Sequence, residues 1–537
     1  MKTPLFSSLR KAMHMAIEAN KQQITAEEIV QRAEHLALTR RKFLENTGKS
    51  LILGGIMPNF LLHTEGVAAR SLSASMRIGA PRIAIIGGGI AGLSALHALK
   101  KGGYDATIYE ASGRTSGRMF SVQGAMGEGT WTEFGGEFID TNHADMHALA
   151  REFNLELMDC AQPSELALKQ EAYFFHGRHY TLTEVVEAFK GLASKIKADA
   201  ERLPDDVNYQ TTDPFTRRID RMSLSEYLDS IGARGFIKHL IEAAYEPEYG
   251  LSPQNQSAIN LLLLISTDTS KDKIEWFGES DERYKVRGGN QSIPDALARL
   301  YPDNIQLNRS LEAISSRGTG YRLNFSGMRN AVDADFVVMA IPFTKLRQVD
   351  IRLRLPQVKW NSINHMGYGT NAKLMLGMNT HLWRAQGYTG LVYSDIGIPN
   401  GWDNAQLQTA DNETAGLSIL FGGARSIALA QGTPEHQRDI YLPKWERIYA
   451  GATAQHNGKI ARMNWHSYKY NLGSYLCYRP GQYTSIGGAE VETVGHLYFA
   501  GEHCGGDFSG YMNGAAKSGR EAGEGILASI GVGVGAR

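Results

Sequence analysis

Three glycines and one acidic residue have the spacing of a site that binds a nucleotide. Gly87, Gly89 and Gly92 form a G-x-G-x-x-G pattern, and Glu110 follows at roughly the 20-residue interval of such sites. The first glycine allows a tight turn, the second lets backbone approach a pyrophosphate, and the third lets helix and strand pack closely. The acidic residue accepts a hydrogen bond from a ribose hydroxyl. The expected chemistry is binding of a dinucleotide cofactor, and this stretch leaves NAD and FAD both open.

The elements that must position this turn are also visible in the sequence. Residues 83–86 form a continuous apolar run, as in a buried parallel strand, and a helix is predicted to begin at the glycines. The N-terminus of that helix would face the phosphates. Residues 106–109 predict a second strand, which Glu110 ends. We therefore expect an α/β fold with a Rossmann-like domain.

Composition limits the classes of partner. A chain of 537 residues with 42% apolar and 21% charged residues is typical of a globular protein with two or more domains. Its 56 basic and 56 acidic residues give no net field that would attract nucleic acid or an anionic membrane. Cys160, Cys477 and Cys504 are too few for a disulfide framework, and their spacing fits no zinc site. We therefore expect no nucleic-acid partner and no metal.

The segment before the glycines has the character of an export signal. Arg40 and Arg41 are followed by Phe43, by a short apolar run over residues 51–62, and by small residues at 67–69. Glycine and proline interrupt the run, which falls short of the roughly 20 apolar residues of a transmembrane helix. The pattern resembles a bacterial twin-arginine signal. The alternative is a surface helix with a chance pair of arginines.

This interpretation divides the N-terminus into three parts. Residues 1–38 are a helical extension, residues 39–69 are the twin-arginine signal, and residues 70–81 are a linker rich in Ser, Ala and Gly. The twin-arginine route carries folded proteins, which suits a protein that must load a cofactor before export. We expect a periplasmic or secreted protein that meets the twin-arginine translocation machinery and has no stable membrane span.

Two arginines indicate which dinucleotide is expected. Arg114 and Arg118 lie in the segment GRTSGR at residues 113–118. This segment resembles the R-x-G-G-R motif of the flavin-containing amine oxidase family, which includes monoamine, polyamine and L-amino acid oxidases. Ser116 replaces the first glycine of that motif. The resemblance implies FAD as the cofactor, with Arg118 supplying charge to its pyrophosphate.

Further segments carry the resemblance through most of the chain from residue 82. TEFGGEFID at 132–140 resembles the family's second glycine segment, where backbone passes beside the flavin, and residues 497–527 resemble its last segment. There, Glu502 would accept a hydrogen bond from the ribityl or phosphate region. A helix after Gly510 would aim its N-terminus at the flavin C2 carbonyl. The cofactor-binding residues that the resemblance implies are Gly87, Gly89, Gly92, Glu110, Arg114, Arg118, Gly135, Gly136, Glu137, Leu311, Glu502 and Met512.

The resemblance also implies two interleaved domains in an α/β fold. One is an FAD/NAD(P)-binding Rossmann-like domain, and the other is a substrate domain made of a mixed sheet plus helices. The FAD-binding domain is expected to use residues 82–150, 284–350 and 485–531, and the substrate domain residues 151–283 and 351–484. Within the substrate domain we expect helices over 180–265 and strands around 371–378 and 389–422.

Three positions match catalytic residues of the family. Lys373, on a strand expected to alternate, matches the lysine that reaches flavin N5 through a water and assists the reaction with oxygen. Tyr475 in LGSYLCYRPG and Tyr511 in SGYMNGA match the two aromatic residues that sandwich the amine nitrogen. Solvent exposure of the lysine and simple packing of the tyrosines are the alternatives.

The implied reaction is oxidation of a CH–NH2 group. Hydride passes from the α-carbon to flavin N5, the imine hydrolyses to a carbonyl compound and ammonia, and O2 reoxidises the flavin to give H2O2. Ser474 stands where monoamine oxidases attach FAD through a cysteine, so we expect non-covalent FAD. Cys477 lies three residues away and leaves covalent attachment as the alternative.

The substrate is left open between a primary amine and an L-amino acid. Phe138 stands where L-amino acid oxidases and tryptophan monooxygenases carry an arginine that binds the α-carboxylate. Arg462 or Arg479 could supply that charge from another element. Glu137 could instead attract a cationic substrate end, or could be a carboxylate satisfied by backbone.

Other functions share the fold. They are a tryptophan 2-monooxygenase-like oxidative decarboxylase, a flavin-dependent desaturase, and a non-catalytic binding protein that keeps the FAD fold. The matches at Lys373, Tyr475 and Tyr511 favour the oxidase. Its partners would be a small amine or amino acid and O2, and a homodimer is left open.

Overall fold

The computed structural model describes residues 5–35, 80–265 and 281–531. The twin-arginine segment expected at residues 39–69, with Arg40 and Arg41, lies outside the described residues. Three larger sheets, of five, four and seven strands, organise the described chain.

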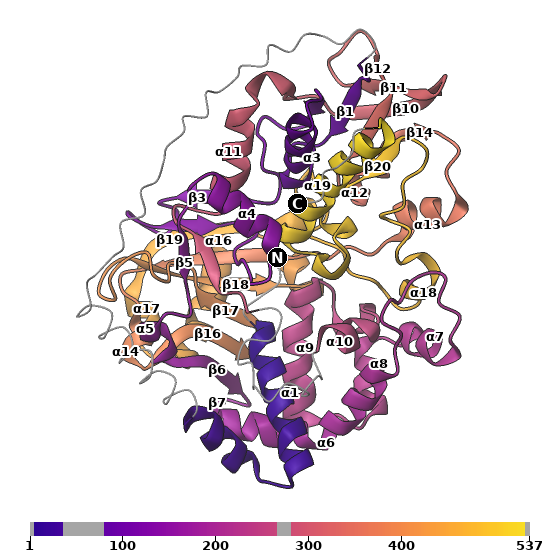
Figure 1. Cartoon of the computed structure of the whole chain (residues 1–537). Helices are drawn as coiled ribbons and strands as arrows, with labels where there is room; N and C mark the ends of the chain where they lie inside the picture. Colours follow the sequence, from indigo (N-terminus) through magenta and orange to yellow (C-terminus); the bar gives the residue numbers. More distant parts are fainter. Residues whose placement is uncertain (1–4, 36–79, 266–280, 532–537) are drawn as a thin grey trace, which may run out of the picture.

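The five-stranded sheet is parallel throughout and confirms the α/β class. α3 (Ile90–Lys101) follows its central strand, and α19 (Met512–Ser529) packs directly on α3. The two helices are so close that a Cβ at Gly519 would lie 2.0 Å from the Ala91 carbonyl oxygen. Figure 1 shows them together at the top, although they come from opposite ends of the chain. In spatial order the strands are β20 (Leu497–Phe499), β13 (Phe336–Met339), β1 (Ile83–Ile86), β2 (Thr107–Tyr109) and β9 (Ile305–Gln306).

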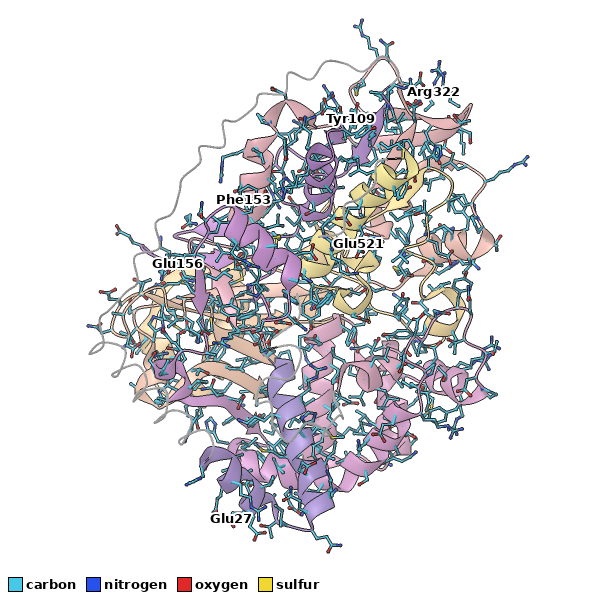
Figure 2. All side chains as sticks on the ribbon, in the orientation of Figure 1. Glu27, Tyr109, Phe153, Glu156, Arg322 and Glu521 are labelled. Atoms are coloured by element: carbon cyan, nitrogen blue, oxygen red, sulfur yellow. The ribbon has the colours of Figure 1, made fainter. Side chains whose placement is uncertain are left out.

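The four-stranded sheet packs beside the parallel sheet. Tyr109, the last residue of β2, stacks on Phe325 of this second sheet with ring centroids 4.2 Å apart. Figure 2 labels Tyr109 and Arg322, which lies on the same strand as Phe325, in the upper part of the molecule. Stacked rings bury apolar area at the junction, so the two sheets form one unit. The strands in order are β12 (Val332–Ala334), β11 (Gly320–Phe325), β10 (Leu311–Arg317) and β14 (Asp350–Arg352).

The seven-stranded mixed sheet lies in the segments that were expected to form the substrate domain. Lys373 lies on β15, whose residues are all buried, so the expectation of an alternating strand is wrong. The strand lies one in from the edge of the sheet, between β19 and β18. α15 (Gly423–Leu429) and α16 (Pro434–Ile448) contact it, and its Lys373 side chain lies against the backbone of Glu133 and Gly135. The strands in order are β19 (His456–Asn464), β15 (Ala372–Met378), β18 (Ala415–Phe421), β17 (Asn400–Asp403), β16 (Tyr388–Ser394), β6 (Lys169–Phe175) and β7 (Arg178–Tyr180).

A group of helices completes the substrate domain in the region expected. They are α6 (Leu182–Glu201), α7 (Pro214–Arg221), α8 (Leu224–Ser230), α9 (Gly235–Tyr249) and α10 (Ile259–Leu264). α6 begins at a capping box in which Thr181 and Glu184 satisfy each other's backbone N–H groups. α9 ends at Gly250, whose φ of 73° is the left-handed conformation that glycine adopts without strain.

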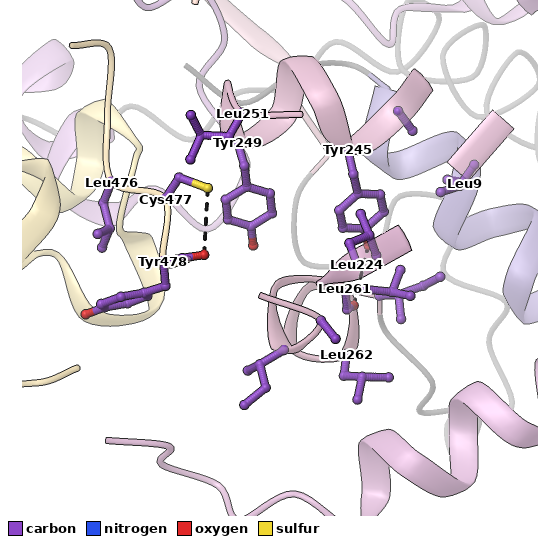
Figure 3. Packing of buried hydrophobic residues seen from close by; sticks show 14 of the residues in the cluster. Leu9, Leu224, Tyr245, Tyr249, Leu251, Leu261, Leu262, Leu476, Cys477 and Tyr478 are labelled. Carbon is purple, nitrogen blue, oxygen red and sulfur yellow. Dashed lines mark hydrogen bonds between the residues drawn. The ribbon is translucent and has the colours of Figure 1, made fainter. Parts of the chain in front are cut away.

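The N-terminal helix is part of this helical group and not a separate extension. α1 (Leu5–Gln22) packs against α6 and α9 and places Leu9, Met13 and Ile17 in the core. Arg10 Nε donates to the carbonyl of Leu264 over 2.7 Å and ties α1 to the end of α10. Figure 1 shows α1 lying along α9, and Figure 3 shows Leu9 near Tyr245. The helix expected within residues 1–38 is therefore present, and it is packed into this helical group.

The remaining elements connect these layers. The short strands are β3 (Ser121–Gln123), β4 (Trp131–Glu133), β5 (Leu157–Asp159) and β8 (Tyr284–Val286). The other α-helices are α4 (Ala144–Glu152), α5 (Pro163–Leu166), α11 (Ser292–Leu300), α12 (Phe343–Leu346), α13 (Gln357–His365), α14 (Leu382–Ala385), α15 (Gly423–Leu429), α16 (Pro434–Ile448), α17 (Ala452–Gln455) and α18 (Tyr483–Ile486). The 3-10 helices are η1 (Pro253–Asn255), η2 (Pro302–Asn304), η3 (Trp465–Ser467), η4 (Glu502–Cys504) and η5 (Gly506–Phe508). Within the described residues, no helix combines the length and apolar character that crossing a membrane requires.

Candidate functional site

A long cavity of about 340 Å³ runs along the carboxyl ends of the parallel strands. Ligands of open α/β sheets bind at this edge, and 300–1,000 Å³ is roughly the usual size of such sites. One end holds residues after β2 and at the start of β10, and the other holds residues around the start of α19. Among the residues lining it are Gly87, Gly89, Glu110, Arg114, Arg118, Gly136, Leu311, Ser474, Tyr475, Glu502, Tyr511 and Met512.

The glycine turn has the geometry that a dinucleotide requires. Gly87 has a φ of 106°, and a Cβ there would lie 2.6 Å from the Ala340 carbonyl oxygen. A Cβ at Gly92 would lie 2.0 Å from the Gly87 carbonyl oxygen, so the helix can pack this closely on the turn only because residue 92 is glycine. A Cβ at Gly89 would meet no protein atom within 4 Å. Because Gly89 lines the cavity, the lack of a side chain at this position leaves room for a ligand and for no protein atom.

Glu110 holds the turn through its carboxylate. Oε2 accepts from the Gly88 N–H over 2.7 Å, and Oε1 accepts from the Ser112 N–H over 2.7 Å. Glu110 and Leu311 both line the cavity, at the end that would take the adenosine half of a dinucleotide. Each carboxylate oxygen has a second lone pair, so a ribose contact by Glu110 is compatible with these bonds.

Arg114 shapes the loop that follows. Its guanidinium donates to the carbonyls of Thr115 and Gly117 and to Ser116 Oγ, and it lies 4.3 Å from the centroid of the Phe120 ring. Ser116 has a φ of 76°, a left-handed conformation that favours glycine, and glycine stands at this place in the motif that the segment resembles. The bond from Arg114 to its hydroxyl stabilises this conformation.

Arg118 and Glu502, which both line the cavity, form an ion pair. Arg118 Nη1 lies 2.8 Å from Glu502 Oε1 and also donates to the Ser474 carbonyl. Glu502 Oε2 accepts from the Leu476 N–H over 3.2 Å. Burial alone would raise the pKa of Glu502, but the positive charge of Arg118 lowers it below its ordinary value. Glu502 lies just after β20, which ends at Phe499, and it begins the short helix η4.

The second glycine segment forms one wall of the cavity. A Cβ at Gly135 would lie 1.8 Å from the Arg118 carbonyl oxygen, and a Cβ at Gly136 would lie 2.7 Å from Met512. Larger residues would therefore push this segment away from both neighbours. Met512 is the first residue of α19, and Tyr511 precedes it, so the helix begins at the cavity, where its N-terminal dipole favours negative charge.

Lys373 lies behind this wall. Its Nζ donates to the carbonyls of Glu133 and Gly135 over 2.9 and 3.1 Å, and to Glu137 Oε2 over 2.8 Å. The side chain is 1% exposed, which excludes the alternative of a solvent-facing lysine. Lys373 is absent from the described residues that line the cavity, so it is placed one layer behind the surface.

Glu137 has a role that sequence reasoning missed. Its carboxylate also accepts from Lys285 Nζ over 3.0 Å and from Trp402 Nε1 over 2.8 Å. Burial raises the pKa of Glu137, but the two lysines outweigh burial and lower it below its ordinary value. Both hypotheses for Glu137 are therefore wrong: two ammonium groups neutralise it, so it neither attracts a substrate cation nor relies on backbone donors. Lys285 lies on β8, far from both partners in sequence, and no local signal identified it.

The two candidate tyrosines both line the cavity near α19. Tyr475 is 2% exposed, and its hydroxyl donates to the Pro247 carbonyl over 2.8 Å. The Tyr511 ring packs edge-on against His143 with centroids 5.0 Å apart. Tyr468 and Tyr470 also line the cavity, so its lining is rich in aromatic rings.

A second cavity, of about 680 Å³, meets the first at Tyr511. Its walls are acidic, with carboxylates from Asp140, Asp205, Asp206, Glu490, Glu492 and Asp507. Among the described residues that line it, Arg10 of α1 alone carries a full positive charge. Burial raises the pKa of Glu490 to about 7. Neither Arg462 nor Arg479 lines this cavity, and Arg462 instead donates to the carbonyls at the end of α15, including that of Leu429.

The described residues that line the first cavity include no cysteine. Ser474 lines it, with its hydroxyl donating to Asn371 Oδ1 over 2.6 Å. Cys477 is buried beside Tyr249 and Tyr478, as Figure 3 shows. No group of three or more His, Cys, Asp or Glu side chains in the described part of the chain could hold a metal ion.

Comparisons with known proteins agree with this geometry. Residues 90–527 match the family described as flavin containing amine oxidoreductase. A flavin-containing amine oxidase of Danio rerio is 24% identical over 459 residues, covering 84% of this chain and 86% of that protein. An L-amino acid dehydrogenase of a Synechocystis species is 23% identical and covers 82% of this chain and 94% of its own length.

Two solved structures have the same fold. Cyclohexylamine oxidase from Brevibacterium oxydans has a TM-score of 0.72 at 20% identity, with 84% of this chain and 99% of that chain covered. Putrescine oxidase bound to putrescine has a TM-score of 0.70 at 18% identity, with 83% and 99% covered. With the family match extending over most of the described residues, this chain belongs to the flavin-containing amine oxidoreductase family.

Proposed function

We propose that the chain is an oxidase that binds FAD non-covalently and oxidises the CH–NH2 group of a primary amine. When bound, FAD would accept hydride from the α-carbon of the amine and pass the electrons to O2, giving H2O2. The observation that carries the proposal is one continuous cavity. It joins the glycine turn at Gly87 to Tyr475 and Tyr511, with the buried Lys373 behind its wall.

The chain's own residues would bind, orient and exclude water. The turn from Gly87 to Gly89 would take the pyrophosphate at the N-terminus of α3, and Arg118 would add positive charge. Tyr475 and Tyr511 would present ring faces to the amine and orient its α-carbon. Their burial supports a site from which water is excluded when the substrate is bound.

The charge of the second cavity supports an amine over an L-amino acid. Its carboxylates would repel the α-carboxylate of an amino acid and attract a cationic amine before it enters the first cavity. Phe138, where an arginine would bind a carboxylate in related enzymes, packs edge-on against Trp402 with centroids 6.1 Å apart. Arg10 is the group that would serve an amino acid substrate, so L-amino acid oxidase is the second candidate.

The absence of cysteine among the described residues around the cavity supports non-covalent FAD. Protein purified with FAD and then denatured with acid is expected to release all of its flavin. Flavin that remains on the precipitated chain would contradict this part of the proposal.

A matched substrate pair tests the reaction. Tyramine and L-tyrosine differ only by the α-carboxylate, so coupled peroxide detection with each measures the preference directly. We expect turnover of tyramine and of other primary amines, with lower kcat/KM for each amino acid counterpart. The reverse order identifies an L-amino acid oxidase, and a decarboxylated amide product identifies a tryptophan 2-monooxygenase-like enzyme. Bound flavin without turnover of either class contradicts an oxidase and leaves the desaturase or a non-catalytic protein.

We also propose that the protein is exported by the twin-arginine pathway to the periplasm or beyond. The support is the sequence around Arg40 and Arg41 together with a cofactor that must be loaded before export. Because α1 is packed in the substrate domain, we propose that residues 5–22 remain bound to the folded protein even if the chain is cut after them. Cell fractionation with an Arg40→Lys/Arg41→Lys variant tests the route, and unchanged export of that variant would contradict it.

A further inference from the structure

The backbone from Glu133 to Glu137 has all of its carbonyls held by side chains. Lys373 Nζ donates to the carbonyls of residues 133 and 135, and Trp465 Nε1 donates to that of residue 134 over 3.0 Å. Asn290 Nδ2 donates to those of residues 136 and 137 over 3.1 and 2.7 Å. A wall with every acceptor satisfied is rigid, so groups attached to it keep a fixed place relative to the cavity.

A buried group of charges is attached to this wall. The Glu137 carboxylate lies between Lys285 and Lys373, at 3.0 and 2.8 Å. The exposed fraction is 3% for the Glu137 side chain, 2% for Lys285 and 1% for Lys373, so solvent screens these charges weakly. Two ammonium groups and one carboxylate leave a net charge of +1. We call these three residues the buried triad.

Two further acids act on the buried triad. Asp403 is buried and its charge acts on Lys285, but Asp403 Oδ2 also lies 2.8 Å from His381 Nδ1. Burial lowers the pKa of His381, but the carboxylate outweighs burial and raises it, so that pair is largely neutral at pH 6. Glu133 is the nearest further acid on the same wall, and its carboxyl accepts from Ser121 Oγ over 2.7 Å and from the Asn290 N–H over 2.8 Å. Burial raises the pKa of Glu133 to about 7, so below neutrality it is largely uncharged. Lys285 also lies 4.5 Å from the centroid of the Phe138 ring, whose face favours a cation.

Lys373 has no donor left for the cavity in this arrangement. An ammonium group has three N–H donors, and all three are used by Glu133, Gly135 and Glu137. Its influence on the cavity is therefore exerted through charge and through the position of the wall. Lys285 contributes to both, because it holds the other oxygen of the carboxylate that Lys373 uses.

We propose that Lys285 is a positioning residue that keeps the buried triad at a net positive charge behind the flavin site and so favours the reduced, anionic cofactor. The inference rests on the proposed function, because it requires a flavin in the first cavity. The protein controls the electronics of a bound cofactor through such fixed charges in a site of low dielectric constant. Removing Lys285 leaves a neutral Glu137–Lys373 pair, and the stabilisation of negative charge is lost.

The midpoint potential of the flavin, measured without any amine, tests this proposal at pH 6, where Glu133 is largely protonated. Lys285→Met removes one positive charge and keeps a side chain of similar length. We expect the two-electron reduction equilibrium to become less favourable by roughly tenfold, which is about 30 mV. The double variant Lys285→Met/Glu137→Gln restores the net charge of +1 and is expected to restore the potential.

Two further variants separate charge from structure. Lys285→Arg keeps the charge and is expected to keep the potential of the unaltered protein. Trp402→Phe removes a hydrogen bond to the same Glu137 oxygen without changing any charge, so a much smaller shift is expected. A potential that falls further in the double variant than in the single one, or that does not move in Lys285→Met, overturns the proposal. A protein that binds no flavin at all would overturn the proposed function instead, so the two failures are distinguishable.

Discussion

Glu133 makes the stability of the protein depend on pH in a way that one substitution should remove. Its side chain is buried, and its pKa is raised from an ordinary 4.5 to about 7, mainly by burial. Hydrogen bonds from the Asn290 backbone and Ser121 only partly offset burial. The folded protein therefore keeps this proton at pH values where the unfolded chain has lost it.

The sign and the size follow from the two pKa values. Between about pH 4.5 and 7 the folded state binds more protons than the unfolded state, so the free energy of unfolding falls as pH rises through this window. Above pH 7 the effect is complete. A shift of about 2.5 pKa units corresponds to a loss on the order of 3 kcal/mol. Glu133→Gln has no proton to lose and should escape that loss.

Urea unfolding of the flavin-loaded protein and of Glu133→Gln, at pH 5, 6, 7 and 8, measures this difference. The stability of the variant relative to the unaltered protein should improve by about 2.5 kcal/mol between pH 5 and pH 8, because part of the effect is already present at pH 5. Glu490→Gln is a parallel test at a second site, because Glu490 is also buried with a pKa raised to about 7 and lines the second cavity, so a similar improvement with pH is expected. A constant difference between Glu133→Gln and the unaltered protein at every pH would refute the reasoning.

Three further predictions concern the cofactor site, the substrate site and α1. Gly89→Ala should fold normally but lose flavin affinity roughly tenfold or more, about 1.4 kcal/mol, because its Cβ would meet only a ligand. Gly92→Ala should instead lower the unfolding temperature of the protein itself. Flavin titration and thermal unfolding separate the two effects. Tyr511→Ala should lower kcat/KM for an amine about 3- to 30-fold, because a ring face is lost, and Tyr511→Phe should retain most of the kcat/KM of the unaltered protein. Steady-state peroxide assays measure both variants. Equal impairment of the two would exclude the ring as the cause. Deleting residues 1–35 uncovers apolar side chains worth about 1.5–3 kcal/mol each, so soluble protein should be lost, while Lys21→Ala on the exposed face of α1 should have no effect on yield.

Sequence reasoning succeeded where the physical signal is local. The turn from Gly87 to Gly92 depends on backbone conformation and on contacts within one strand–turn–helix unit, so spacing alone was informative. The strand at residues 83–86 and the helical region beginning near residue 180 follow from short-range apolar patterns in the same way. The parallel sheet was predictable because its central strand is apolar along its whole length.

Sequence reasoning failed where partners come from distant segments. Lys373 was expected on an alternating strand, but β15 is buried along its whole length, because distant segments pack on it: α15 and α16 contact the strand, and Glu133 and Gly135 lie against Lys373. The helix within residues 1–38 was expected, but its packing against α6 and α9 was not, because an amphipathic pattern indicates a buried face without indicating which element covers it.

The sequence by itself determined that this chain can hold a dinucleotide, since the required glycines and their flanking strand and helix are neighbours along the chain. Only the tertiary structure decided the charge behind that site. Three separate segments supply its residues, Glu137, Lys285 and Lys373. Nothing in the sequence around any one of them distinguishes it from a charged residue at the surface. They become one electrostatic unit because folding removes them from water together, and a buried charge is stable only beside its partner.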